Sequence, residues 1–193
     1  MSSGAPQVRG AHTAEVWRRA VAQDPASASS HHNLGMALWR AGCAAEAEQE
    51  LRKALELRPD FPEALVNLGG FLLARWDYRG SVETNRQAAK LRPDLLIAHY
   101  NQGLGHLYLG EADAMVACLR RALELDGQHP GAHYHLAVGL LALGQVTESH
   151  AHLDAALEGG FSPAPEFLKA LAKAEGGESP ARSNPPPAGE KPQ

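Results

Sequence analysis

Apolar and polar residues alternate along this chain with the spacing of amphipathic helices, most clearly between His31 and Pro59. The first half of this segment carries an apolar stripe at i, i+3, i+4 and i+7, formed by His31, Leu34, Gly35 and Leu38. The second half carries another, formed by Ala47, Leu51 and Ala54. Gly42 between them can adopt the left-handed backbone conformation that ends the first helix. Pro59 ends the second helix because proline cannot continue it. Neither helix can bury its stripe alone, so the segment predicts a packed helix pair.

The same unit recurs every 34 residues. Its opening Asn33-Leu34-Gly35 returns as Asn67-Leu68-Gly69, Asn101-Gln102-Gly103 and His135-Leu136-Ala137. The turn glycine returns as Gly110 and Gly144, and the closing proline returns as Pro93. A helix–turn–helix period of this length, with an early Leu-Gly, a later Ala and a closing Pro, resembles the tetratricopeptide repeat (TPR) family. The resemblance covers about residues 28 to 163.

The resemblance implies an all-α fold, a right-handed α-solenoid of tandem helix–turn–helix TPR units with terminal capping helices. Trp17, Ala20 and Pro25 repeat the spacing of Leu51, Ala54 and Pro59, which indicates a half-repeat before the first full unit. We therefore divide the chain into a disordered N-terminus 1–11, a capping half-repeat 12–25, four units 28–61, 62–95, 96–129 and 130–163, a capping helix 164–175, and a disordered tail 176–193.

The second unit departs from the pattern at three places. Trp76 stands where the other units have the turn glycine, Ser81 replaces an alanine, and Asn85 replaces a large apolar residue. Asn85 is expected to point inward, where an amide without a partner costs about 1–3 kcal/mol. In the third unit, His106 replaces a large residue and Met115 replaces a small one, so these two units are expected to have the loosest cores.

Unit positions 2, 5, 6, 9, 12 and 13, counted from residues 28, 62, 96 and 130, share one face of each first helix. In the TPR family this face lines a concave groove, so the resemblance implies a non-catalytic adaptor or scaffold that binds a peptide or helix of a partner protein there. The candidate groove residues are Asn33, Met36, Trp39, Arg40, Val66, Asn67, Tyr100, Asn101, Leu104, Tyr108, Tyr134, His135 and Val138.

Asparagine occupies unit position 6 in three successive units. An amide both donates and accepts hydrogen bonds, so a row of amides would bind an extended backbone without reading its sequence. The alternative is that these amides pack between units. His135 takes this position in the fourth unit, where an imidazole would make the donor pH-sensitive.

One family subclass binds chaperone C-terminal carboxylates through a clamp of Lys, Arg and Asn in the groove. Unit positions 2 and 5 of this chain hold no Lys or Arg, and Arg40 alone does not complete a clamp. An Hsp70 or Hsp90 tail is therefore not the expected partner.

Charge and composition narrow the partner class further. A net charge of −4 and a pI near 6.2 give no attraction toward nucleic acid or anionic membrane. No apolar run approaches the length of a membrane span, so no membrane insertion is expected. The two cysteines, Cys43 and Cys118, form no disulfide framework, which favours a cytoplasmic location.

The ten histidines raise the question of a metal site. The pairs His133/His135 and His150/His152 are two residues apart, and such side chains diverge by about 200° around a helix. His31, His99 and His133 share unit position 4, where a half-buried ring is expected to pack as an aromatic residue does. We expect no metal and no cofactor, and no catalytic constellation indicates an enzyme.

Two other functions stay open from the sequence. The chain could assemble with copies of itself through its ends or its convex surface, and light scattering over a range of concentrations would detect such a homo-oligomer. It could instead be an assembly factor for a metalloenzyme, with histidines contributing, which zinc or nickel titration would test.

Overall fold

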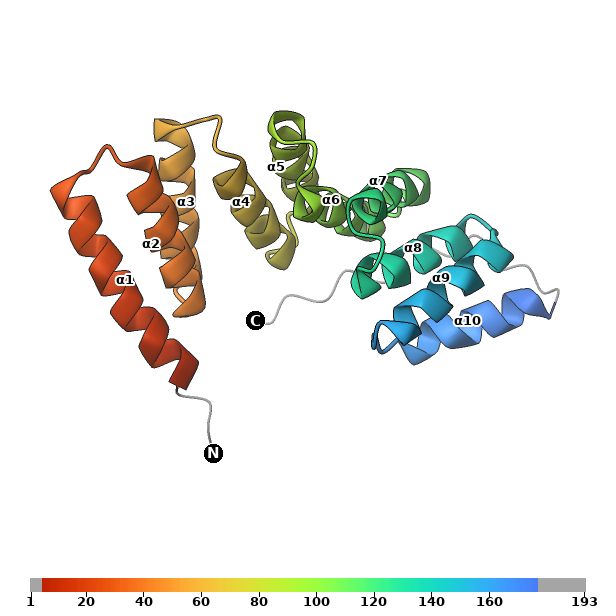
Figure 1. Ribbon diagram of the computed structural model, residues 1–193. Coiled ribbons are helices and arrows are strands. Elements are labelled where there is room, and N and C mark those ends of the chain that lie inside the picture. Colours follow the sequence, from red (N-terminus) through yellow and green to blue (C-terminus); the bar gives the residue numbers. More distant parts are fainter. Residues whose placement is uncertain (1–4, 177–193) are drawn as a thin grey trace.

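The computed structural model describes residues 5–176, with side chains from residue 12 onward, and this part of the chain forms ten α-helices and no strand. The helices are α1 (Ala5–Gln23), α2 (Ala28–Arg40), α3 (Ala44–Leu57), α4 (Pro62–Ala74), α5 (Tyr78–Leu91), α6 (Leu96–Leu109), α7 (Ala112–Leu125), α8 (Pro130–Ala142), α9 (Val146–Glu158) and α10 (Pro165–Glu175). Figure 1 shows consecutive helices side by side in one curved row. The predicted all-α helical-repeat solenoid is confirmed.

The first helix is longer than the sequence pattern predicts. α1 begins at Ala5, whereas the pattern predicts a start at His12 with a disordered stretch before it. Proline is tolerated in a first turn, so Pro6 does not prevent this extension. Ala14 is buried, and Trp17 and Val21 pack against the core that α2 contributes to. The tail from residue 177 onward lies outside the described residues, so its expected disorder stays a prediction.

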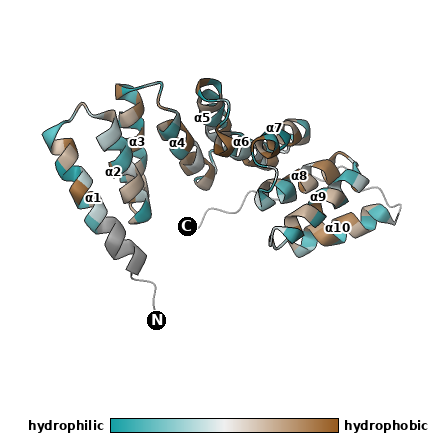
Figure 2. Ribbon diagram, viewed as in Figure 1, coloured by the Kyte–Doolittle hydropathy of each residue, from teal (hydrophilic) through white to brown (hydrophobic). Residues whose placement is uncertain are grey.

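Hydrophilic and hydrophobic residues alternate along the helices, as amphipathic packing requires (Figure 2). The inward stripes are buried as predicted, with Leu34, Leu38 and Leu51 each almost fully covered. Within the described part of the chain, none of the helices combines the length and apolar character needed to cross a membrane.

Glycine at unit position 8 lets the two helices of a unit approach closely. A Cβ atom on Gly69 would lie 2.1 Å from Nδ2 of Asn85, and one on Gly103 would lie 2.7 Å from Cγ of Leu119. No real side chain tolerates such distances. The glycines therefore set the spacing between α4 and α5 and between α6 and α7.

The turn inside each unit contains one residue with a left-handed backbone. Three units use glycine there, with φ of 83° at Gly42, 73° at Gly110 and 75° at Gly144. The second unit uses Trp76 at φ 63°, and half of its surface is exposed. A left-handed conformation costs a residue with a Cβ about 1–2 kcal/mol, so this turn is strained.

Asn85 points inward as predicted and is fully buried on α5. Its Nδ2 donates to the carbonyl oxygen of Ser81 at 2.9 Å, and its Oδ1 accepts from Nδ2 of Asn101 at 3.4 Å. The buried amide therefore has the partners that an inward position requires. The donor comes from the next unit, which a pattern within one unit does not reveal.

The last helix covers the end of the array. Phe167 and Leu171 of α10 are buried against Tyr134 and Leu153. α10 thus packs on the fourth unit as a further unit would, which protects an apolar end from water.

Candidate functional site

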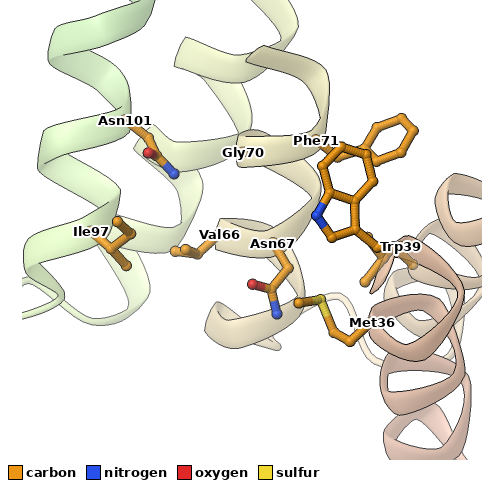
Figure 3. Close-up of a pocket in the computed structure, with 9 residues that line it drawn as sticks. Met36, Trp39, Val66, Asn67, Gly70, Phe71, Ile97 and Asn101 are labelled. Atoms are coloured by element: carbon orange, nitrogen blue, oxygen red, sulfur yellow. The ribbon is translucent and has the colours of Figure 1, made fainter. Parts of the chain in front are cut away.

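A pocket of about 300 Å³ opens between α2, α4 and α6 (Figure 3). It is lined by Met36, Trp39, Leu51, Val66, Asn67, Gly70, Phe71, Ile97 and Asn101. Two of these nine residues, Asn67 and Asn101, carry amides, and the other seven are apolar residues or glycine. No charged residue lines the pocket. The pocket therefore suits an apolar group with a small number of hydrogen bonds.

The repeat geometry explains where this pocket forms. The first helices of three successive units stack beside one another, and Gly70 occupies unit position 9, where the first unit has Met36. A Cβ atom on Gly70 would meet nothing nearer than Nδ2 of Asn101 at 3.6 Å. The missing side chain on α4 thus leaves open space between its two neighbours.

An exposed indole marks one side of the pocket. The rings of Trp39 and Phe71 lie edge to face, with their centroids 5.1 Å apart. Phe71 is buried, whereas Trp39 is 41% exposed, and Ile97 on α6 is 38% exposed. Large apolar side chains in this state contribute much of the binding free energy when a partner covers them.

Asn67 is held by a histidine from the preceding unit. Its Nδ2 lies 2.8 Å from Nε2 of His32, and because an amide nitrogen only donates, the imidazole accepts. Burial is the main cause of a lowered pKa at His32, which keeps the ring neutral and able to accept. Figure 3 shows the amide oxygen of Asn67 on the side of Val66 and Ile97.

Asn101 is also engaged within the protein. It is buried, and its Nδ2 donates to the fully buried Asn85. The row of amides at unit position 6 is therefore not a row of free donors, because internal acceptors use one N–H of Asn67 and one of Asn101.

The candidate groove residues separate into two groups. Five of them line the pocket together, namely Met36, Trp39, Val66, Asn67 and Asn101. The other eight lie elsewhere, namely Asn33, Arg40, Tyr100, Leu104, Tyr108, Tyr134, His135 and Val138. Arg40 is exposed at the end of α2, and the exposed Tyr108 stacks on Tyr78 of α5 at 4.6 Å. Leu104 and Val138 are half-buried.

Tyr134 does not face an open groove. It is only 8% exposed, stacks on Phe161 at 4.5 Å, and its hydroxyl accepts a hydrogen bond from the backbone N–H of Ala164. The segment around α10 covers this face of the last unit, as a following unit covers it elsewhere. The candidate residue Tyr134 is therefore part of the core at this end.

His135 lies in the same aromatic cluster. Its ring is 5.1 Å from that of Tyr134 and 5.9 Å from that of Tyr100. Its Nδ1 is buried without a hydrogen-bond partner, and burial lowers its pKa from 6.5 to about 4. The ring is therefore neutral at physiological pH.

Four residues of the pocket are missing from the candidate list, namely Leu51, Gly70, Phe71 and Ile97. Gly70 and Ile97 occupy groove positions 9 and 2, and Leu51 belongs to the inward stripe. Phe71 follows Gly70 at unit position 10, between the inward face and the groove face. The one signal available in the sequence is the glycine pair Gly69-Gly70, because a second glycine beside the packing glycine has no role in the helix pair.

The histidines at unit position 4 do more than pack as aromatic rings. Each places Nε2 near the carbonyl oxygen of the residue six positions earlier, at 3.1 Å for His31 and Pro25, 2.9 Å for His99 and Pro93, and 3.0 Å for His133 and Gly127. A carbonyl only accepts, so Nε2 carries the proton in all three. In the described residues, no three histidine, cysteine or acidic side chains cluster as a metal site.

The arrangement of paired helices with a shared core between successive pairs defines a helical-repeat interaction protein of the α-solenoid class. Tetratricopeptide repeat models match residues 28–61 and 100–165. The chain belongs to the tetratricopeptide repeat family. Members of this family generally serve as non-catalytic modules for protein–protein interaction, and the chain shares this scaffold. No curated protein matches the sequence.

Solved structures share the fold at low identity. A crystal structure of MamA has a TM-score of 0.71 at 19% identity, over 76% of this chain and 86% of that chain. A structure from the functional characterization of Pseudomonas aeruginosa pilF has a TM-score of 0.73 at 24% identity, over 83% and 74%. TTC0263, a thermophilic TPR protein in Thermus thermophilus, has a TM-score of 0.60 at 21% identity, over 84% and 87%.

Proposed function

We propose that this protein is an adaptor or scaffold that binds a peptide or helix of a partner protein along the first helices of its units. The pocket between α2, α4 and α6 receives an apolar side chain of that partner. The observation that carries this proposal is the pocket itself, together with the exposed Trp39 beside it. The partner is a protein segment rather than nucleic acid, because the pocket is apolar and the chain carries a net negative charge.

The groove amides have a narrower part in this proposal than the sequence suggested. Asn67 and Asn101 each donate one N–H to an internal acceptor, so they are held in fixed orientations. Asn67 retains an amide oxygen beside Val66 and Ile97, which suits a backbone N–H of the bound segment (Figure 3). Preorganised groups of this kind lower the entropic cost of binding.

A cytoplasmic location is part of the proposal. Both cysteines are free and only partly buried, and burial raises the pKa of the Cys118 thiol. Unpaired cysteines of this kind are typical of a reducing compartment.

The experiment fills the pocket with a larger side chain of the protein itself. Gly70→Leu adds a side chain where a Cβ atom has room, and it replaces glycine by a better helix former. The matched control, Gln87→Leu, adds the same side chain at an exposed position of α5. The probe is a phage-displayed library of random 12-residue peptides, selected on the wild-type protein.

A selected peptide should bind wild type and Gln87→Leu equally and Gly70→Leu at least about tenfold more weakly, which corresponds to about 1.4 kcal/mol. Fluorescence anisotropy with the labelled peptide measures this, with thermal melts as a check on folding. Failure to select any peptide, or equal binding by Gly70→Leu, would remove the pocket from the function.

A further inference from the structure

Unit positions 4 and 23 face each other across the two helices of a unit. In the first unit they hold His31 and Glu50, whose Nδ1 and Oε2 atoms lie 2.6 Å apart. In the fourth unit they hold His133 and His152, whose Nδ1 atoms lie 2.9 Å apart. The third unit has His99 and Cys118 at these positions, and the second has Leu65 and Thr84. Only the fourth unit therefore joins two imidazoles.

The hydrogen bonds around this pair fix which nitrogen of His133 is free. Its Nε2–H donates to the carbonyl oxygen of Gly127 at 3.0 Å, so the neutral ring has its lone pair on Nδ1. That lone pair points at Nδ1 of His152, which donates to it when no ion is bound.

The outer nitrogen of His152 faces a carboxylate. Its Nε2 lies 3.9 Å from Oε1 of Glu148, which Arg120 holds at 2.7 Å. Histidines that bind metals almost always donate their second N–H to a carbonyl or carboxylate. Gly127 supplies the carbonyl for His133. Glu148 is the carboxylate nearest to Nε2 of His152, but at 3.9 Å it is beyond hydrogen-bond distance and would have to approach the ring when an ion binds.

We propose that His133 and His152 form a binding site for one divalent transition-metal ion between α8 and α9. On binding, the Nδ1 proton of His152 is lost and Nε2, facing Glu148, takes up a proton, so no net proton is released. Two Nδ1 atoms then coordinate the ion, and water fills the remaining positions. The side chain of His152 is 23% exposed, so an ion reaches the site from solvent.

The distance between the two nitrogens can be compared with the distances that particular ions require. Two ligands at about 2.05 Å and 90° to each other lie about 2.9 Å apart, which is the square-planar or tetragonal arrangement of Cu²⁺ and Ni²⁺. A tetrahedral ion such as Zn²⁺ requires about 3.3 Å. The observed 2.9 Å is also the ordinary length of the hydrogen bond that joins the two rings without an ion, so it does not by itself select an ion. Cu²⁺ is the ion of choice because it binds most tightly in this series. This inference is independent of the pocket and of any protein partner.

The test uses the full-length chain and CuCl₂ as the probe, in calorimetric titration and electron paramagnetic resonance. Wild type should bind one equivalent that His152→Gln and His133→Asn bind at least about tenfold more weakly. The matched control is His99→Asn, which removes the equivalent histidine from a unit without the second imidazole. It should keep the wild-type equivalent and its nitrogen hyperfine pattern.

A melt gives a second readout, because an ion that joins α8 to α9 stabilises the folded chain. One equivalent of Cu²⁺ should raise the melting temperature of wild type and His99→Asn, but not that of His152→Gln. If His133→Asn fails to fold, His152→Gln still tests the site, because His152 is only partly buried and its replacement disturbs the core less. Identical isotherms for wild type and a folded His152→Gln would overturn the site.

Discussion

Asn67 and His32 are joined by a 2.8 Å hydrogen bond that links the groove faces of α4 and α2. The amide donates and the imidazole accepts, so the bond depends on a neutral ring. Phe61 packs against the same imidazole, with ring centroids 4.9 Å apart. The orientation of a pocket-lining amide is thus set by a histidine of the preceding unit.

Replacing this histidine should therefore be felt in the pocket. His32→Phe keeps a ring beside Phe61 but removes the acceptor for Asn67. We expect weaker binding of a groove peptide, by about two- to tenfold, because the amide is no longer held. The matched control His99→Phe changes a histidine that lines no part of the pocket. Anisotropy measures both, and equal affinities for the two variants would contradict the role of the bond.

Asn101→Ala should destabilise the fold, although a free groove amide would be dispensable. It removes the donor that pairs with the fully buried Oδ1 of Asn85. An unpaired buried polar group costs about 1–3 kcal/mol, and the 3.4 Å length of this bond places the loss toward the lower end. Asn33→Ala, at the same unit position but only half-buried, is the control and should cost less. Urea unfolding monitored by circular dichroism compares the two.

Trp76→Gly should stabilise the protein. Glycine adopts the left-handed backbone of this turn without penalty, and the half-exposed indole contributes little burial. We expect a gain of about 1 kcal/mol, or about 2–4 °C in melting temperature for a chain of this size. Trp76→Ala retains the strain and should not give this gain. A lower melting temperature in the glycine variant would mean that the indole stabilises the fold by contacts that exceed the strain.

Two adjacent glycines should respond in opposite directions to alanine. Gly69→Ala places a methyl group where Asn85 lies within 2.1 Å and should destabilise, because both α5 and its buried amide must move. Gly70→Ala has room and should stabilise by up to about 1 kcal/mol through helix propensity. Chemical denaturation of the pair checks this, and equal effects would refute the close approach of α4 and α5.

The free energy of unfolding should decrease as the pH is lowered, partly because of His135. Its pKa is about 4 in the folded chain and 6.5 when unfolded, so below pH 6.5 the unfolded state binds the proton first. The loss grows from pH 6.5 to pH 4 and reaches about 3 kcal/mol at most. His135→Leu should show a shallower decline over this range, measured by urea unfolding at several pH values. An unchanged pH dependence would place the ring in water.

The sequence predicts the helix pairs well because each pair is a local pattern. The spacing of Leu34 and Leu38, the turn at Gly42 and the stop at Pro59 all lie within one unit. The hydrogen-bond partners of the groove amides were not predictable in this way. Asn67 bonds to the preceding unit and Asn101 bonds to α5, so their roles depend on how neighbouring units stack.

The candidate site was likewise predictable where it depends on the helix pattern, and not where it depends on which segments pack against it. The groove face of the first three units brings Met36, Trp39 and Val66 together, as helical spacing predicts. Tyr134 occupies a groove position too, yet it is buried because the segment around α10 covers the last unit. The sequence predicts a capping helix at 164–175, but the repeat pattern does not show which residues of the last unit that helix covers.

The histidine at unit position 4 has a mechanical consequence for the whole array. Through their bonds to Pro25, Pro93 and Gly127, His31, His99 and His133 fasten the joints before the first, third and fourth units. The second unit has Leu65 there, and leucine has no donor. The joint at Pro59 therefore lacks this hydrogen bond, and the contacts of His32 with Asn67 and Phe61 link the two units there instead. This joint lies in the loop between α3 and α4, so bending at it would move α4 relative to α2 and change the width of the pocket between them.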